Sequence, residues 1–195
     1  MSDICSINAD NYSSNENWTF INYLDTSNIT NGKIGEIQQL DCEMDKIPSR
    51  ARRKILPRDI VYSTVRPIQN HYGIIIEPAE NMLVSTGFSV IRSSVRSISN
   101  EQIYLLLSRN ETTEKLQQIA ENSTTTYPSI KPSDIGNCVI VMPPIDVSME
   151  FSRIVVPLFN QIEENNKQSL LLQNMRDTLL PKLMSGELDV SELSN

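Results

Sequence analysis

The sequence is poor in the residues that most catalytic and metal sites require. It contains one histidine, three cysteines and six glycines in 195 residues. His71 alone cannot build a histidine-based metal cluster. Cys5, Cys42 and Cys138 are odd in number and include no C-x-x-C pair, so we expect neither a zinc site nor a disulfide framework. No P-loop, glycine-rich dinucleotide motif or G-x-S-x-G elbow occurs. These absences favour a binding role over catalysis.

Two motifs of enzymes that act on nucleic acids are also missing. Met142 stands where the Asn/Asp-Pro-Pro-aromatic motif of amino-methyltransferases would need a polar residue before Pro143 and Pro144. No E-x-K occurs to complete a typical nuclease site. Acidic pairs such as Glu163–Glu164 fall in a predicted helix, where a solvated face explains them without acid–base chemistry.

Long hydrophobic runs are absent as well. No stretch of 18 apolar residues occurs, so we expect no membrane span and no membrane partner. Residues 1–18 contain acids but no Lys, Arg or apolar run, so we expect no signal peptide. Three unpaired thiols are typical of a reducing compartment, and the expected location is therefore the cytoplasm.

Charge is distributed very unevenly along the chain. The total of 17 basic and 24 acidic residues gives −7, which by itself argues against a nucleic-acid partner. Residues 1–45 have one base and eight acids, whereas residues 46–109 have ten bases and four acids. Between Lys46 and Arg66, seven bases are opposed by Asp59 alone. Because salt screens charges beyond about 8–10 Å, this segment can hold phosphates even on an acidic protein.

The hydrophobic pattern predicts an α+β fold in two regions. A small mixed-sheet domain is expected over 1–145, and a helical region over 146–195. β-Branched runs bounded by Pro, Gly, Asn or Asp predict strands at 55–64, 72–77, 83–92 and 138–142.

Two helices and a loop are expected between these strands. Ser99 and Gln102 form a capping box, so a helix should begin near Asn100. A second helix is expected over 111–121. The polar, proline-bearing segment 123–133 is expected to be a loop.

The last region predicts a long helix of coiled-coil type. Its apolar residues follow a seven-residue pattern: Phe151, Val155, Leu158, Ile162, Leu172 and Leu179. At 1.5 Å per residue, 151–180 would span about 45 Å. A helix this long with a thin apolar stripe needs a partner helix, within the chain or from another subunit. The alternative is a terminal helix that packs on its own domain.

Three blocks in a fixed order resemble the target recognition domain of type I restriction–modification specificity subunits. They are Pro48–Lys54, Pro57–Pro67 and Ser85–Val90. Ser123–Pro128, Val139–Pro144 and Leu179–Leu188 are similar to further parts of that family. The resemblance covers about residues 18–190. Family members usually have two recognition domains and two helical regions, and this sequence has one of each.

The resemblance implies a non-catalytic subunit of a bacterial or archaeal complex. Its recognition domain would bind double-stranded DNA and read one half of a bipartite site. Its helix would set the spacing and recruit methyltransferase subunits, which methylate adenine at N6, and a motor/endonuclease subunit would add restriction. S-adenosylmethionine, ATP and Mg are then expected only in partner subunits, with no cofactor in this chain. The chain would form a homodimer or pair with another specificity chain.

Candidate DNA-binding residues lie in the basic segment and in two polar stretches. They are Arg50, Arg52, Arg53, Lys54, Arg66, Gln69, Asn70, His71, Tyr72, Thr124, Thr125, Thr126 and Tyr127. Arginine offers forked donors to phosphates, and Gln or Asn can read adenine. Because it precedes a proline, Arg66 is expected on extended backbone. Pairing with Asp41, Glu43 or Asp45 would instead neutralise the basic cluster within the chain.

Three functional alternatives stay open at this point. The chain could be an inactive or decoy half-subunit that acts only in protein assembly. It could be a fragment from a gene set that recombines its recognition domains. It could also be a small methyltransferase-like or nuclease protein that acts alone, which predicts binding of S-adenosylmethionine or metal.

Overall fold

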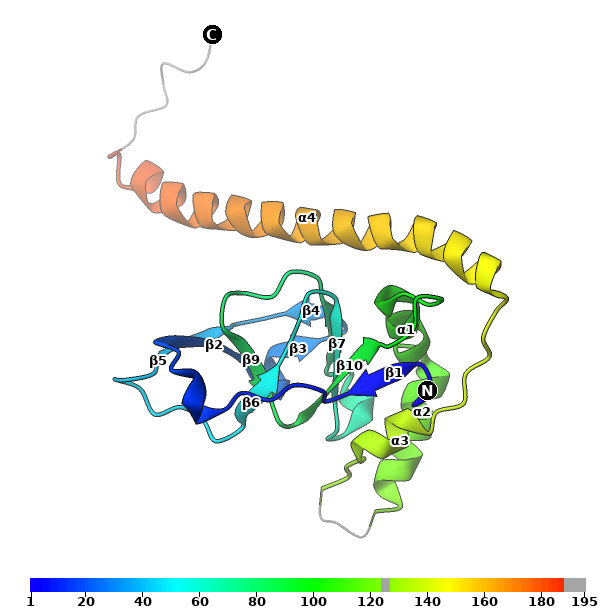
Figure 1. Ribbon diagram of the computed structural model, residues 1–195. Coiled ribbons are helices and arrows are strands. Elements are labelled where there is room, and N and C mark those ends of the chain that lie inside the picture. Colours follow the sequence, from blue (N-terminus) through cyan, green and yellow to red (C-terminus); the bar gives the residue numbers. More distant parts are fainter. Residues whose placement is uncertain (124–126, 188–195) are drawn as a thin grey trace. The chain divides into compact units, whose positions relative to one another are not determined.

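The computed structural model describes residues 1–123 and 127–187 and confirms the α+β class (Figure 1). The chain divides into two compact units, Met1–Val156 and Pro157–Asn195. The expected boundary at residue 145 coincides with the start of the last helix, α4 (Ile145–Met184). About three turns of this helix belong to the first unit.

Two four-stranded sheets form most of the first unit. Sheet A has the order β1-β10-β7-β8 with antiparallel neighbours, and sheet B has the order β5-β2-β9-β6, in which β2 and β9 are parallel. A β3–β4 pair is separate. The bounds are Cys5–Ile7 (β1), Phe20–Leu24 (β2), Ile29–Thr30 (β3), Lys33–Ile34 (β4), Gln38–Asp41 (β5), Ala51–Lys54 (β6), Asp59–Ser63 (β7), Tyr72–Ile75 (β8), Met82–Ser85 (β9) and Phe88–Ser93 (β10).

Two expected strands are divided by local structure. The run 83–92 contains two strands, β9 in sheet B and β10 in sheet A, which Thr86 and Gly87 connect. The run 55–64 begins as a turn, because the Leu56 N–H donates to the Asp59 carboxylate at 2.7 Å, and only its second half is strand β7. Strand β8 agrees with the expected run at 72–77.

The expected strand at 138–142 is wrong. These residues form no strand, and the side chains of Val139 and Val141 are 95% and 89% exposed. The segment connects α3 to α4 without pairing to either sheet. An apolar, β-branched composition was therefore not enough to form a strand, because this segment does not pair with the edge of either sheet.

The helices agree closely with the sequence. The Ser99–Gln102 capping box is formed and begins α1 (Asn100–Leu107), and α2 covers Asn110–Glu121. Residues 127–131 are irregular as expected, and α3 (Pro132–Gly136) follows. Three 3₁₀ helices complete the described elements: η1 (Ser14–Glu16), η2 (Thr26–Asn28) and η3 (Pro67–Gln69).

Sheet B buries apolar side chains on both faces. Its inner face joins sheet A in a core cluster that includes Leu24, Val84 and Phe88. Its outer face forms a second cluster from Ile21, Tyr23, Ala51 and Leu83, against which partly buried side chains pack: Tyr12, Trp18, Leu40, Cys42 and Ile47. The period-2 alternation of a strand explains how Leu83 and Val84 enter different clusters.

The first turns of α4 are fixed to α1 by buried polar contacts. The Gln102 amide donates to the Ser148 carbonyl at 2.9 Å, and its side-chain oxygen accepts from the hydroxyls of Ser148 and Ser152, both at 3.1 Å. The Ser148 hydroxyl also lies 2.5 Å from the Ser97 carbonyl. Val155, which follows Ser152 by about one turn of α4, is also buried, and only 6% of its surface is exposed. These contacts explain why the first unit extends into the helix.

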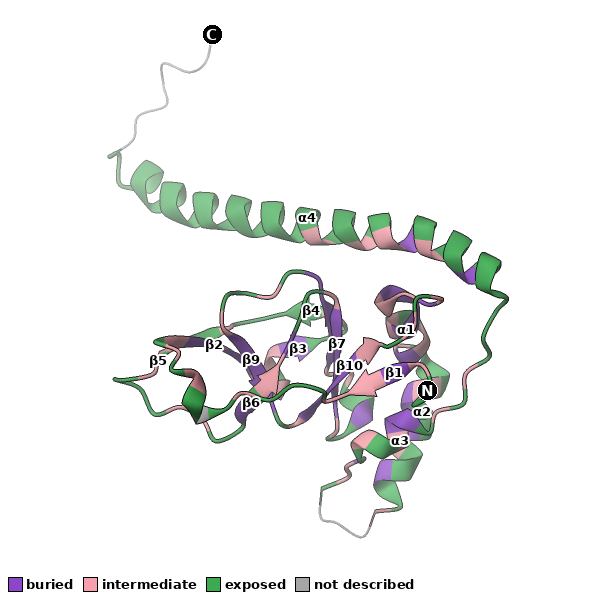
Figure 2. Cartoon of the chain, viewed as in Figure 1, coloured by how far each residue is buried: buried purple, intermediate pink, exposed green. Residues whose placement is uncertain are grey.

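Beyond Val155 the side chains of α4 are mostly exposed, as Figure 2 shows. The helix runs on past Pro157 and Pro181. Across residues 1–123 and 127–187, no helix is both long and apolar enough to cross a membrane.

Gly87 gives a stability prediction for the crossing between the sheets. A Cβ atom there would lie 2.8 Å from the Thr26 methyl, so a glycine lets the two segments approach closely. We expect Gly87→Ala to lower the free energy of unfolding by about 1–3 kcal/mol through overpacking. Thr26→Ser removes the methyl, so Thr26→Ser/Gly87→Ala should recover most of the loss in urea denaturation. A double variant no more stable than Gly87→Ala would contradict this explanation.

Candidate nucleic-acid interface

Four segments meet at one edge of the first unit, which we call the loop edge: Ser49–Arg52, Thr86–Gly87, Thr64–Arg66 and Tyr127–Ile130. Backbone hydrogen bonds join them in this order. The Thr86 N–H donates to the Arg50 carbonyl at 2.8 Å, and the Thr64 N–H donates to the Gly87 carbonyl at 2.8 Å. The Ile130 N–H then donates to the Thr64 carbonyl, also at 2.8 Å. The loop edge is thus a continuation of both sheets.

The length of the loop edge suits a groove of duplex DNA. Strand neighbours lie about 4.8 Å apart and successive Cα atoms about 3.8 Å, so the hydrogen-bonded path from Arg50 to Ile130 is at most about 18 Å. The major groove of B-DNA is about 12 Å wide. The loop edge is therefore of the same order as the width of one groove.

Arg50 and Arg52 are the exposed cations at one end of the loop edge. Both side chains are exposed, and within the described residues neither has an acidic partner. Arg52 lies in β6 where the pairing with β9 shifts register between Ala51 and Arg53. Such bulges redirect a side chain away from the regular ladder.

Arg53 and Lys54 are already engaged within the chain. Arg53 donates to the Asn11 side-chain oxygen at 2.8 Å, and partial burial lowers its pKa. Lys54 pairs with Glu16, and its ammonium lies 5.3 Å from the centre of the Trp18 ring. The hydrogen bond from Lys54 is the main reason that the pKa of Glu16 is lowered. These two bases are weaker candidates for phosphate contact than Arg50 and Arg52.

Two of the acids considered as internal partners of the basic cluster, Asp41 and Asp45, have other roles. The Asp41 carboxylate accepts from the N–H groups of Glu43 and Met44, at 2.8 and 3.1 Å. The Asp45 carboxylate accepts from the Asp41 N–H at 2.8 Å. They stabilise the turn after β5 and leave Arg50 and Arg52 unneutralised.

Arg66 and Tyr127 form the other end of the loop edge. The Arg66 guanidinium lies 5.7 Å from the centre of the Tyr127 ring, and both side chains are exposed. The expectation of extended backbone at Arg66 is wrong, because its φ of 46° and ψ of 70° are left-handed. The turn into η3 imposes this uncommon conformation, which a non-glycine residue adopts only when its surroundings hold it.

The four candidates from Gln69 to Tyr72 do not share one exposed surface. Gln69 is exposed beside the loop edge, whereas the Asn70 carbonyl accepts from the Asn31 N–H at 2.9 Å. His71 Nδ1 lies 2.7 Å from the Ile29 carbonyl, so this nitrogen carries the proton. Tyr72 is buried and stacks on Tyr62 at 5.3 Å, which excludes it from reading DNA in this conformation.

The remaining candidates are three threonines before Tyr127 and the apolar residues of α4. Thr124, Thr125 and Thr126 lie outside the described residues. On α4, Phe151, Leu158, Ile162, Leu172 and Leu179 are exposed as a helix partner would require, while Val155 is buried within the first unit. Val155 is therefore unavailable to a partner helix.

Thr64 and Thr86 were not predicted as site residues. Both occupy central positions on the loop edge, and Thr86 is exposed. Their position depends on the crossing of β9 and β10 between two sheets, for which the sequence has no local pattern. No group of three or more His, Cys, Asp or Glu side chains in the described residues could hold a metal ion.

Comparison with known proteins agrees with this architecture. No protein-family model matches the chain. The HindI type I restriction enzyme specificity subunit of Haemophilus influenzae is 30% identical over 160 residues, which is 80% of this chain and 34% of that protein. The MjaIX specificity subunit of Methanocaldococcus jannaschii is 49% identical over 69 residues, or 35% of this chain and 16% of that protein. The chain is a homologue of type I restriction enzyme specificity subunits.

Solved structures show the same fold. The HsdS subunit of Thermoanaerobacter tengcongensis has a TM-score of 0.64 at 24% identity, covering 91% of this chain and 45% of that one. A chain from a structure on complex assembly and conformational transition of the type I R-M system has a TM-score of 0.65 at 23% identity, covering 97% and 48%. The chain thus spans about a third of the HindI specificity subunit and about half of either solved chain.

Proposed function

We propose that this chain gives DNA-sequence specificity to a type I restriction–modification complex. The loop edge binds one half of a bipartite site on duplex DNA, and the exposed part of α4 contacts partner subunits. The observation that supports this most directly is the hydrogen-bonded path that brings Arg50 and Arg66 to one edge. The homologous specificity subunits provide the biological setting.

The division of chemistry in this proposal follows from the residues present. Methylation of adenine at N6 and DNA cleavage belong to methyltransferase and motor/endonuclease subunits, together with their S-adenosylmethionine, ATP and Mg. This chain positions them on the DNA as a non-catalytic subunit in the cytoplasm of a bacterium or archaeon. Arg50 and Arg66 fix the position on phosphates, and polar side chains between them read base edges.

Genome-wide mapping of N6-methyladenine tests the proposal. Deleting the gene should abolish methylation at one interrupted motif, and the wild-type gene should restore it. A homodimer predicts a symmetric motif, and pairing with another specificity chain predicts an asymmetric one. If the parent strain expresses the chain normally and deletion of the gene leaves methylation unchanged, the proposal is contradicted. That result would favour an inactive assembly module.

The exposed apolar side chains of α4 give a second prediction. Leu172 is 65% exposed, and burying such a side chain against a partner helix contributes about 1.5–3 kcal/mol. In light scattering we expect a dimer, or a complex with a methyltransferase subunit, that Leu172→Asp dissociates. Asn174→Asp adds the same charge on another face of α4 and serves as the matched control. A wild-type chain that stays monomeric at high concentration and with the methyltransferase subunit present would contradict the prediction that α4 pairs with a partner helix.

A further inference from the structure

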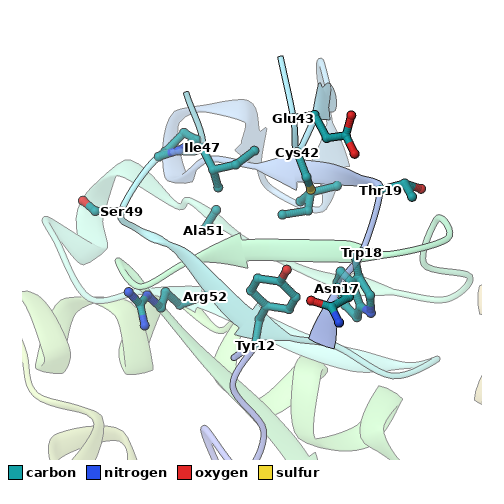
Figure 3. Close-up of a pocket in the computed structure, with 12 residues that line it drawn as sticks. Tyr12, Asn17, Trp18, Thr19, Cys42, Glu43, Ile47, Ser49, Ala51 and Arg52 are labelled. Atoms are coloured by element: carbon teal, nitrogen blue, oxygen red, sulfur yellow. The ribbon is translucent and has the colours of Figure 1, made fainter. Parts of the chain in front are cut away.

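A groove of about 520 Å³ lies on the outer face of sheet B, beside the Arg50 end of the loop edge. Its floor includes Ile21 and Ala51 of the outer apolar cluster. Figure 3 shows the rings of Tyr12 and Trp18 on one side and Cys42 and Ile47 on the other. Its volume falls within the range of small-molecule sites, about 300–1,000 Å³.

Two aromatic rings form one wall of the groove. The ring centroids of Tyr12 and Trp18 are 4.6 Å apart with an interplanar angle of 41°. The Tyr12 N–H donates to the Arg52 carbonyl at 2.7 Å, which fixes this wall to β6. Lys54 lies over the Trp18 ring and restrains it further. The aromatic wall is thus held in place before any ligand binds.

The charges at the groove differ between its two sides. Arg52 lies at one side and Glu43 at the opposite side in Figure 3. Both side chains are exposed, and within the described part of the chain neither forms an ion pair. An anionic group would therefore bind on the Arg52 side, two residues from Arg50 on the loop edge.

We propose that this groove binds an unpaired nucleotide of a DNA strand, with its base against Tyr12 and Trp18 and its phosphate at Arg52. The proposal rests on the proposed function, since DNA at the loop edge brings a strand to the Arg52 side. Aromatic side chains accept the face of any base, and arginine offers forked donors to phosphate oxygens. An aliphatic or cationic ligand would leave Arg52 without a partner.

The sequence itself provides the reporter for a test. Trp18 is the only tryptophan of the chain, so its fluorescence, selectively excited, reports on the aromatic wall of this groove. The probes are the oligonucleotide (dT)8 and an octamer with the same phosphates in which every base is replaced by an abasic site. We expect (dT)8 to change the emission saturably, and the abasic octamer to bind at least about five-fold more weakly.

Variants separate the phosphate contact from general charge. Arg52→Ala should weaken (dT)8 binding and lower its salt slope by about 0.7, the value for one phosphate on single-stranded DNA. Arg96→Ala removes the same charge at an exposed position before α1, and its slope should equal that of the wild type.

Two results would overturn the proposal. One is an emission that does not respond to (dT)8 while the chain still binds a labelled duplex. The other is equal affinity for (dT)8 and the abasic octamer, which would show that no base stacks on the aromatic wall. Loss of duplex binding as well would instead count against the proposed function, so the two failures can be distinguished.

Discussion

Replacing Arg50, Arg52 and Arg66 together by alanine should lower the slope of log K against log salt by about 2.7 for duplex DNA, since each phosphate contact contributes about 0.9. The wild type should consequently lose roughly 40-fold more affinity than the triple variant between 50 and 200 mM salt. All three side chains are exposed on the loop edge. Arg53 is left intact, because it already donates to Asn11.

The matched control is a triple variant of cations outside the loop edge, at Lys33, Arg96 and Arg109. It changes the net charge by the same three units and has the same effect on long-range attraction. Because these side chains contact no phosphate in the proposed complex, its salt slope should equal that of the wild type. Equal slopes for the two triple variants would show that binding depends on net charge rather than on the loop edge.

Local patterns predicted the helices of this chain better than its strands. The Ser99–Gln102 capping box predicted the start of α1 because the two residues satisfy each other's backbone groups without any tertiary contact. The charge distribution indicated the basic segment from Lys46 to Arg66 but did not separate the exposed Arg50 and Arg52 from the engaged Arg53 and Lys54. The long helix followed from the seven-residue apolar pattern of the last region.

Tertiary contacts explain the features of the structure that the sequence did not predict. Tyr72 was expected to bind DNA from a polar stretch, but its ring stacks on Tyr62 from the neighbouring strand β7. Val155 fits the helix stripe by spacing, yet the first unit buries it. Tyr12 and Trp18 belong to an N-terminal segment whose pairing with β6 depends on residues about 40 positions away. No local pattern encodes such contacts.

Replacing Asp59 by alanine should lower the free energy of unfolding by about 3 kcal/mol, because it removes three hydrogen bonds to a fully buried carboxylate. The Asp59 side chain is fully buried and accepts from Arg92 Nε and Nη2, both at 2.7 Å. It also accepts from the Leu56 N–H at 2.7 Å. One carboxylate thus joins β7, β10 and the turn before β7.

Asp10 offers a control on the same arginine. Its carboxylate lies 3.2 Å from Arg92 Nη1 but is 49% exposed, so Asp10→Ala should cost no more than about 1 kcal/mol. The bond to Asp59 is also the main reason that the pKa of Arg92 is raised. Urea denaturation should therefore show a much lower midpoint for Asp59→Ala at an unchanged slope, and nearly no shift for Asp10→Ala. Similar midpoints for the two variants would contradict the prediction. They would show that the buried hydrogen bonds of Asp59 contribute no more to stability than the exposed contact between Asp10 and Arg92.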